Sequence, residues 1–372
     1  MSSVRRVLLV QPQSGARWRS ITAYAESLRA LLEDAGPEVA TAEAPWFNPP
    51  SVIEGLRSRW TAQPNVQRAA EGAFDLVHLT DHALAHHVGR FARNAAVVVT
   101  CHDLMPFTTP GYYAPGPEGP LKRLFLRRSI AALKQADITV AVSEFTSGEA
   151  ERFAQVPRER ILVVPNVVRA GFVPMERSTA EARLAEAGVR LGQRKRVLSV
   201  GNDRAYKNLP ALLEAMAQPE LAACELVRVG PLTKEDRARI ERLGLSRRLF
   251  VVDGLDDSLL GALYVACDVL AQPSLAEGFG IPVIEAMACG LPVVVSDGGA
   301  LPEVAGQAAA VVQLAGEDFT GRLAAALRTA LDIPDDWVAA GQTRARGYSA
   351  EAVTPRLLAA YEAAFARRNA RK

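Results

Sequence analysis

The sequence predicts an α/β protein built from two doubly wound domains, each with a parallel sheet covered by helices. Short apolar runs alternate with helical patterns along most of the chain, which is typical of parallel strands joined by crossover helices. The run Arg5–Gln11 (RRVLLVQ) is nearly repeated at Lys195–Gly201 (KRVLSVG), and a loop and a helical pattern follow each copy. Since a chain of 372 residues is too long for one comfortable core, the repeat indicates that a second domain begins near Lys195.

The first half of the chain supplies the elements of a first domain, which we place at residues 1–168. A helical pattern over Tyr24–Gly36 follows the opening strand. Ser143 stands between an apolar run and the next helical pattern, so we expect it to be an N-cap rather than a nucleophile. The remaining strands are expected within Phe74–His82, Ala95–Asp103 and Ala136–Glu144.

The second half follows the same alternation. Residues 169–193 contain no pattern of a buried strand and are interpreted as a linker, so the second domain is placed at residues 194–348. Residues 349–372 form an amphipathic helix with a basic tail, which we expect to pack back on the first domain. Further strands are expected within Cys224–Gly230, Arg248–Gly254, Asp268–Ser274 and Pro292–Asp297.

Composition narrows the class of protein. Hydrophobic residues make up 49% of the chain and charged residues 23%, as in a folded globular protein. A net charge of +2 gives no strong field for nucleic acid. The four cysteines lie in apolar or small-residue contexts without a CxxC pair, which predicts buried, reduced thiols in the cytoplasm. The apolar run near the N-terminus is too short for a secretory signal, and none is long enough for a transmembrane helix.

The stretch SLAEGFGIPVIEAMACG carries the strongest functional signal. Glu277 lies in a loop after a predicted strand, and Glu285 lies in the helix that follows. Between them, Gly278, Phe279 and Gly280 precede the start of that helix, so their amides suit a phosphate or a sugar hydroxyl. In doubly wound sheets, ligands bind beyond the carboxyl ends of the strands, where this loop is placed.

These residues resemble the E-x7-E element of the family 4 glycosyltransferases, which have the GT-B fold of two Rossmann-like domains facing across a cleft. The similarity extends through SVGNDRAYKNLPALLEAM and RVGPL in the second half. The resemblance implies a retaining transfer of a hexose from a nucleotide diphosphate sugar. It assigns the ribose hydroxyls to Glu285 and the donor hexose to Glu277, which is expected to be catalytic.

The resemblance extends to residues around the donor phosphates. Lys207 matches the family's diphosphate-binding lysine and would stabilise the leaving group. The usual arginine is absent because Asn202 and Tyr206 occupy its positions, so Arg204 is assigned that role. Gly15 matches the small-residue loop near the phosphates.

The acceptor side is expected in the first domain. His102, at the end of a strand, resembles the catalytic histidine that faces the transferred sugar, and Asp81, His82 and Asp103 are acceptor-side candidates. The histidine spacing in HLTDHALAHH is also compatible with a metal site, but surface positions for His86 and His87 are the simpler interpretation.

Neither metal nor any other cofactor is required by the resemblance, because cationic side chains and a helix N-terminus would stabilise the diphosphate. The YKNL loop resembles that of mannosyltransferases in polysaccharide assembly, which favours GDP-mannose slightly over UDP-sugars. The acceptor would be a glycan, a lipid-linked sugar or a small molecule. The basic stretch Leu121–Ser129 either contacts the inner face of the membrane or packs its leucines on the sheet, and we favour packing.

Other functions remain open from the sequence. A nicotinamide dehydrogenase is disfavoured because no Gly-x-Gly-x-x-Gly follows the first strand. A sugar-nucleotide epimerase or hydrolase would share the fold. A non-catalytic, hinged sugar-binding protein would bind sugar without turnover.

Overall fold

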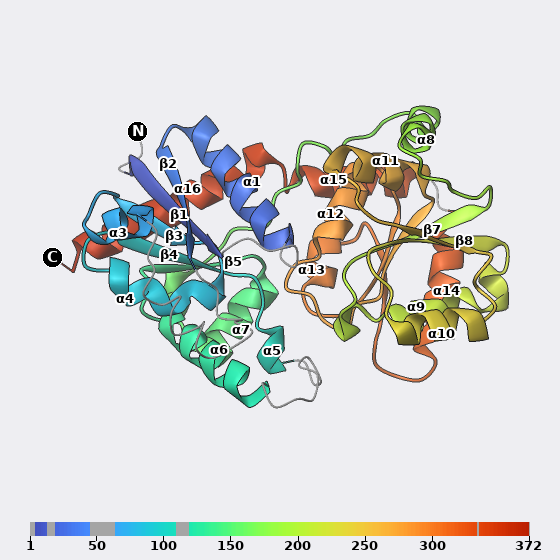
Figure 1. Cartoon of the computed structure of the whole chain (residues 1–372), viewed down its shortest axis with the longest axis horizontal. Coiled ribbons are helices and arrows are strands. Elements are labelled where there is room, and N and C mark those ends of the chain that lie inside the picture. Colours follow the sequence, from blue (N-terminus) through green and yellow to red (C-terminus); the bar gives the residue numbers. More distant parts are fainter. Residues whose placement is uncertain (1–3, 13–18, 45–63, 109–118, 333–334, 372) are drawn as a thin grey trace. The chain divides into compact units, whose positions relative to one another are not determined.

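The computed structural model describes residues 4–12, 19–44, 64–108, 119–332 and 335–371, and the chain divides into two compact units (Figure 1). Unit 1 comprises Met1–Val167 and Ala350–Lys372, and unit 2 comprises Val168–Ser349. Each unit contains one six-stranded sheet in which all strand pairs are parallel. The predicted fold class of two doubly wound Rossmann-like domains is therefore confirmed.

The sheet of unit 1 has the strand order β2-β1-β3-β4-β5-β6. Its strands are β1 (Arg6–Pro12), β2 (Glu38–Ala44), β3 (Leu76–Leu79), β4 (Ala96–Cys101), β5 (Ile138–Ala141) and β6 (Ile161–Val163). The helices are α1 (Arg19–Ala35), α3 (Pro64–Ala70), η1 (His82–His87), α4 (Val88–Phe91), α5 (Met105–Thr108), α6 (Gly119–Leu133), α7 (Glu144–Ala154), η2 (Arg158–Arg160) and α16 (Ala350–Asn369). Ser143 is the N-cap of α7, as predicted, because its side chain accepts from the amide of Thr146.

The sheet of unit 2 has the strand order β12-β11-β10-β7-β8-β9. Its strands are β7 (Lys195–Val200), β8 (Cys224–Val229), β9 (Leu249–Val252), β10 (Val269–Gln272), β11 (Val293–Ser296) and β12 (Ala310–Val312). The helices are α8 (Arg177–Glu186), η3 (Ala205–Lys207), α9 (Leu209–Met216), η4 (Pro219–Leu221), α10 (Lys234–Arg242), α11 (Asp257–Ala266), α12 (Ile281–Ala288), α13 (Leu301–Ala305), α14 (Phe319–Ala330) and α15 (Asp335–Arg346). The segment 169–193 includes α8, which packs against α11 within unit 2.

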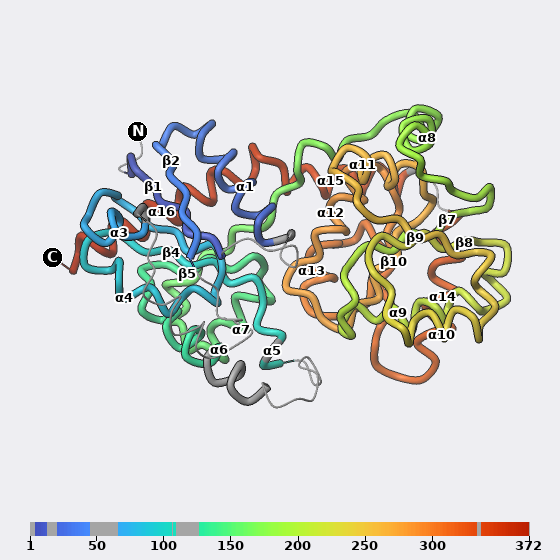
Figure 2. Tube along the Cα trace, in the orientation of Figure 1, coloured from blue at the N-terminus to red at the C-terminus, as the bar shows by residue number. Residues whose placement is uncertain are grey.

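Alternation along the strands of unit 1 builds a core on each face of the sheet. Leu8 and Val10 point into one apolar cluster, whereas Val7 and Leu9 point into the other. The second cluster is covered by α1 and α16, so the C-terminal segment returns to complete the core of unit 1 (Figure 2). The four cysteines are free and buried, as the sequence predicts.

A buried polar chain ties α16 to this sheet. The hydroxyl of Tyr361 lies 2.8 Å from His78 Nδ1, and His78 Nε2 lies 2.7 Å from Thr100 Oγ1. Thr100 Oγ1 in turn lies 2.9 Å from the hydroxyl of Tyr24 on α1. Burial, assisted by the nearby His102, lowers the pKa of His78 from 6.5 to about 3. His78 is therefore neutral in the folded protein and acts as one donor and one acceptor within the chain.

From this buried hydrogen-bonded network we predict that the stability of unit 1 falls at acidic pH. The unfolded state binds a proton at His78 below about pH 6.5, whereas the folded state does not until about pH 3, so stability is lost as the pH falls between these values. Between about pH 7 and pH 5, His78 alone should cost about 2 kcal/mol of unfolding free energy. We would measure this from hydrogen exchange of the β3 and β4 amides, comparing wild type with His78→Gln. Equal pH dependence in the two proteins would contradict the prediction.

Candidate functional site

Glu277 and Lys207 are brought together at the carboxyl ends of β10 and β7, which are neighbours in the sheet of unit 2. Lys207 Nζ, at the end of η3, donates to Glu277 Oε1 at 2.7 Å. Gln272 Nε2 and Ser274 Oγ donate to the same oxygen at 2.8 and 2.7 Å. Both charged side chains are nearly buried, so this is a desolvated ion pair with additional hydrogen bonds. Within the described part of the chain, no group donates to Glu277 Oε2, which leaves that oxygen available to a hydroxyl group.

Glu285 lies in α12 and is held by residues of two other segments. Arg169 Nη2 donates to Glu285 Oε1 at 2.7 Å, and the hydroxyl of Tyr264 donates to Oε2 at 3.0 Å. Arg169 Nη1 also lies 2.5 and 2.6 Å from the two carboxylate oxygens of Asp257. Burial raises the pKa of Glu285, and the guanidinium of Arg169 offsets part of that rise. Each carboxylate oxygen has a second lone pair, so Glu285 can still accept a hydrogen bond from a ribose hydroxyl.

The loop Gly278–Phe279–Gly280 leads directly into α12. Gly280 is the N-cap with φ of 100°, which favours glycine, and Pro282 lies in the first turn as predicted. Phe279 is buried and packs edge-to-face on the ring of Tyr348, with centroids 5.5 Å apart. The buried side chain of Phe279 therefore anchors the loop, and only the backbone of this residue can contact a ligand.

Arg204 is the N-cap of η3, three residues before Lys207, and is half-buried. Its amide donates to Asn202 Oδ1 at 3.2 Å, which shapes the start of the loop. Within the described ranges, its guanidinium makes no ion pair, in contrast to Lys207. The structure therefore places both predicted cations on one short loop but pairs only Lys207 with a carboxylate.

His102 lies just beyond β4 in unit 1. Its Nε2 donates to the carbonyl oxygen of Thr80 at 2.9 Å, and its ring meets that of Tyr24 edge-on, with centroids 4.6 Å apart. Burial lowers the pKa of His102, although the nearby Asp81 opposes the change. With the proton on Nε2, the neutral ring leaves Nδ1 as an acceptor.

The other candidates of unit 1 have local structural roles. Asp81 Oδ1 accepts from the amide of Ala83 and caps η1 at its N-terminus. Asp103 Oδ1 accepts from the amide of Met105 at 3.1 Å, and burial raises the pKa of Asp103. His82 Nδ1 is buried and has no hydrogen-bond partner among the described residues. Gly15 lies outside the described residues.

The histidine run does not gather into a metal site. Among the residues with described coordinates, no group of three or more His, Cys, Asp or Glu side chains is placed to hold a metal ion. His86 Nδ1 instead donates to the carbonyl oxygen of Ala83 at 2.9 Å, and His78 belongs to the buried chain described above.

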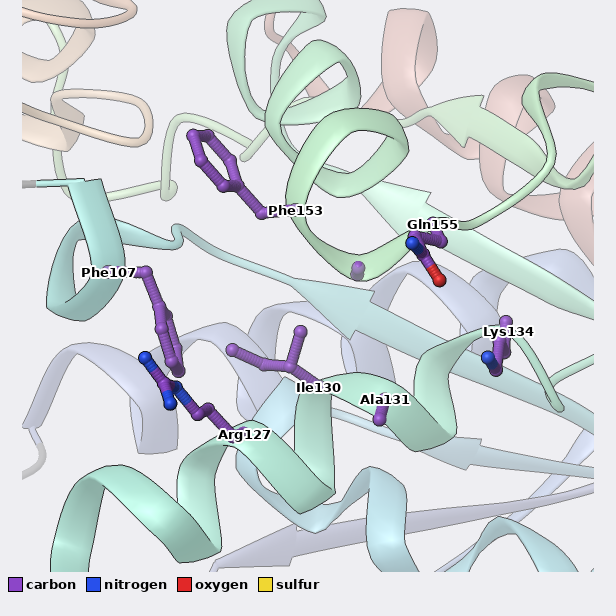
Figure 3. Close-up of a pocket in the computed structure, with 8 residues that line it drawn as sticks. Phe107, Arg127, Ile130, Ala131, Lys134, Phe153 and Gln155 are labelled. Carbon is purple, nitrogen blue, oxygen red and sulfur yellow. The ribbon is translucent and has the colours of Figure 1, made fainter.

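Helix α6 carries the basic stretch Leu121–Ser129, and the side chains of Leu121–Phe125 lie outside the described residues. Arg127 and Arg128 are exposed, whereas Ser129 is buried and donates to the carbonyl oxygen of His82. A pocket of about 380 Å³ lies beside this helix, and Figure 3 shows the side chains that line it. Its lining residues come from α5, α6 and α7 and from the residues that directly follow α6 and α7: Phe107, Arg127, Ile130, Ala131, Lys134, Phe153, Ala154 and Gln155. In the described part of the chain, no helix has the length and apolar character to span a membrane.

Several residues of this site escaped sequence analysis. Arg169 gives no local signal, because it is 88 residues from Asp257 and 116 from Glu285. Tyr264 reads as one more core residue of an apolar helix. Gln272 and Ser274 did offer a signal, since polar residues at a strand end lie only a few positions before Glu277.

Comparison with known proteins identifies the family. Residues 5–171 match the model described as Glycosyltransferase Family 4, and residues 183–343 match the model described as Glycosyl transferases group 1. The chain belongs to the family 4 glycosyltransferases, which confirms the resemblance carried by Glu277 and Glu285.

The curated relatives match between about half and two thirds of the chain. The serotype-specific mannosyltransferase WbdA of Escherichia coli is 31% identical over 201 residues, which are 52% of this chain and 24% of WbdA. A D-inositol 3-phosphate glycosyltransferase of Mycobacterium sp. (strain KMS) is 29% identical over 63% of this chain and 52% of that protein. The chain thus spans about a quarter of the first of these relatives and half of the second.

Solved structures share the fold across the whole chain. Sucrose-phosphate synthase from Thermosynechococcus elongatus has a TM-score of 0.74 at 22% identity, covering 95% of this chain and 97% of that one. Anabaena HepE in complex with UDP and glucose has a TM-score of 0.71 at 20% identity, covering 94% and 97%. The predicted GT-B fold is confirmed.

The backbone of Glu277 packs against Gly299, so we predict that an alanine costs more stability at Gly299 than at Gly244. Gly299 and Gly244 have φ of 66° and 67°, but a Cβ on Gly299 would lie 2.3 Å from the carbonyl oxygen of Glu277, whereas one on Gly244 meets nothing within 4 Å. Gly244→Ala should cost about 1–2 kcal/mol from left-handed strain. Gly299→Ala should cost about 1–3 kcal/mol more from overpacking. Calorimetric unfolding of both variants measures the difference, and equal losses would contradict it.

Proposed function

We propose that this protein transfers a hexose from a nucleotide diphosphate sugar to a glycan, lipid-linked or small-molecule acceptor. The observation that carries the proposal is the convergence of Lys207 and Glu277 at the carboxyl edge of the unit 2 sheet. In a family 4 chain, this pairing puts a cation and a hydroxyl acceptor beside the loop at the start of α12. Unit 2 is accordingly assigned to the nucleotide sugar and unit 1 to the acceptor.

The donor roles follow from charge and geometry. Lys207 and Arg204 supply positive charge for the diphosphate as it leaves, so no metal is needed for that task in this proposal. The amides of Gly278, Phe279 and Gly280 and the start of α12 add partial positive charge. Glu285 receives the ribose hydroxyls, and Glu277 receives the donor hexose through its available oxygen.

The transfer is proposed to retain the anomeric configuration. The acceptor hydroxyl would attack from the face that the diphosphate leaves, and the leaving phosphate would take the acceptor's proton. His102 is assigned to the transferred sugar, where a neutral ring with an acceptor at Nδ1 can receive a sugar hydroxyl. Asp81, His82 and Asp103 remain candidates for the acceptor side, and Gly15 for the phosphates.

The names of the relatives and of the fold neighbours guide the choice of substrates to test. The relatives named as mannosyltransferases favour GDP-mannose as donor, whereas the fold neighbour HepE was crystallised with UDP and glucose. The relatives named as D-inositol 3-phosphate glycosyltransferases suggest inositol 3-phosphate as one acceptor to test. We place the protein in the cytoplasm, with contact to the inner face of the membrane through α6 as an additional proposal.

Nucleotide binding tests the donor site. Calorimetric titration of the full chain with UDP and with GDP should give tight binding of one of them. Glu285→Gln should weaken that binding about 10- to 100-fold, because hydrogen bonds to a charged group are lost. The exposed Glu220→Gln serves as the control and should bind like wild type. Binding of neither nucleotide, or an unchanged affinity in Glu285→Gln, would overturn the proposed donor site.

Transfer itself is tested with GDP-mannose and UDP-glucose, offered with a mannose-terminated oligosaccharide or inositol 3-phosphate. Lys207→Met and Glu277→Gln should each lower kcat by a factor of about 100 or more, because each removes charge at the reacting groups. The exposed Lys234→Met is the matched control. Proton NMR of the product should show the donor's anomeric configuration. Near-normal turnover in either variant, or an inverted product, would contradict the assigned roles or the mechanism.

A further inference from the structure

Arg228 is a buried cation near the carboxyl end of β8, which lies between β7 and the edge strand β9 of the unit 2 sheet. It lies on β8 opposite Ser199 of β7 and is only 1% exposed. Its Nη1 donates to Ser199 Oγ at 2.9 Å, and its Nη2 donates to the carbonyl oxygens of Gly201 and Asn202 at 2.9 and 2.7 Å. Its Nε has no partner among the described residues. All of its hydrogen bonds therefore go to the end of β7 and the start of the loop that follows.

This guanidinium lacks a carboxylate partner. Within the described ranges, no Asp or Glu oxygen lies within ion-pair distance of Arg228. Asp203 and Asp236 are near enough to act on it electrostatically, yet burial prevails and lowers the pKa of Arg228 to about 10. A buried, uncompensated cation is costly, and the strand neighbours Val227 and Val229 show the apolar residues usual in such a strand. An anionic ligand near this guanidinium would therefore stabilise its charge.

The loop held by Arg228 is built to present backbone amides. A planar trans peptide points its carbonyl and its amide in opposite directions. Since the carbonyls of Gly201 and Asn202 point toward Arg228, the amides of Asn202 and Asp203 point away from it. In the part of the chain that the structure describes, neither amide finds an acceptor. Two adjacent amides that point to the same side of a loop can donate hydrogen bonds to one anion.

Close packing fixes this loop. Gly230 has φ of 120°, and a Cβ on it would lie 1.9 Å from the carbonyl oxygen of Gly201. A Cβ on Gly201 would lie 3.4 Å from the side chain of Lys207. The loop start, Arg228 and Lys207 thus pack around one another, and a shift of the first would move the others.

We propose that the amides of Asn202 and Asp203, backed by the buried guanidinium of Arg228, form a phosphate-binding site for the diphosphate of the nucleotide donor. Arg228 acts as a positioning residue, since it reaches the ligand through the loop and through its charge rather than by contact. This inference rests on the proposed function and adds a site to it. Lys207 and Arg204 lie on the same loop, so the site would supply the backbone part of diphosphate recognition.

The test compares nucleosides with nucleoside diphosphates on the full chain. Uridine, guanosine, UDP and GDP are titrated into wild type, Arg228→Met and Arg228→Lys. Arg228→Met should weaken diphosphate binding about tenfold or more and leave nucleoside binding unchanged. The variant removes a buried positive charge and the hydrogen bonds that order the loop, and a nucleoside has no phosphate to be affected by either loss. Arg228→Lys keeps the charge without the fork and should give an intermediate loss.

Arg248→Met is the matched control. Arg248 also donates to three backbone carbonyls in unit 2, those of Leu221, Cys224 and Met216, at distances of 2.8 to 3.0 Å. Its contacts lie at the opposite ends of the strands, so its loss should change stability but not the ratio of UDP to uridine affinity. A reduced ratio in both variants would show a general structural effect and overturn the inference.

A second measurement uses wild type alone and does not depend on the variants folding. Pyrophosphate added to isotope-labelled protein should shift the amide resonances of Asn202 and Asp203. Unshifted resonances, or an unchanged affinity ratio in Arg228→Met, would overturn this inference while leaving nucleotide binding at Glu285 standing. A wild type that binds neither UDP nor GDP nor pyrophosphate would overturn the proposed function and the inference together.

Discussion

The ion pair between Lys207 and Glu277 sets the requirements that the rest of unit 2 meets. Two charges removed from water are stable only with good geometry and further hydrogen bonds, here supplied to Glu277 by Gln272 and Ser274. The two residues follow β7 and β10. These strands must therefore lie side by side and end at the same edge of the sheet. The doubly wound topology provides this adjacency, although 70 residues separate the two side chains along the chain.

Buried charge recurs at this edge in three forms. Glu277 shares one oxygen among three donors and keeps the other available, whereas Glu285 has both oxygens held by Arg169 and Tyr264. Arg228 has only carbonyl and hydroxyl acceptors. The first arrangement leaves a whole carboxylate oxygen for a ligand and the third leaves positive charge, whereas Glu285 offers only the second lone pairs of its two oxygens. Such incomplete satisfaction is costly in an empty site and is expected where binding energy will later compensate.

The fold and part of the site were predictable from sequence because the relevant signals are local. Apolar runs alternating with helical patterns specify parallel sheets. Glu277 and Lys207 closely follow such runs, and Glu285 lies in the helix after one of them. Arg169 was not predictable, because its partners are brought to it only by the folded sheet. Arg228 is visible in the sequence as an arginine inside the apolar run CELVRVG. A strand pattern alone, however, does not indicate whether such a residue is buried. The capping role of Asp81 and the hydrogen bond from the amide of Met105 to Asp103 depend on backbone geometry after the strands, which spacing does not specify.

Unit 1 contains two histidines, His78 and His102, that burial keeps neutral. Burial lowers the pKa values of both His78 and His102, and each ring is fixed by hydrogen bonds to neutral oxygens. Tyr24 joins the two histidines, since its hydroxyl meets Thr100 and its ring meets His102. Because His78 also holds Tyr361, the orientation of the ring at the end of β4 is tied to the packing of α16. The last helix of the chain therefore supports the histidine that we assign to the transferred sugar, which gives a physical reason for the chain to return to unit 1 after completing unit 2.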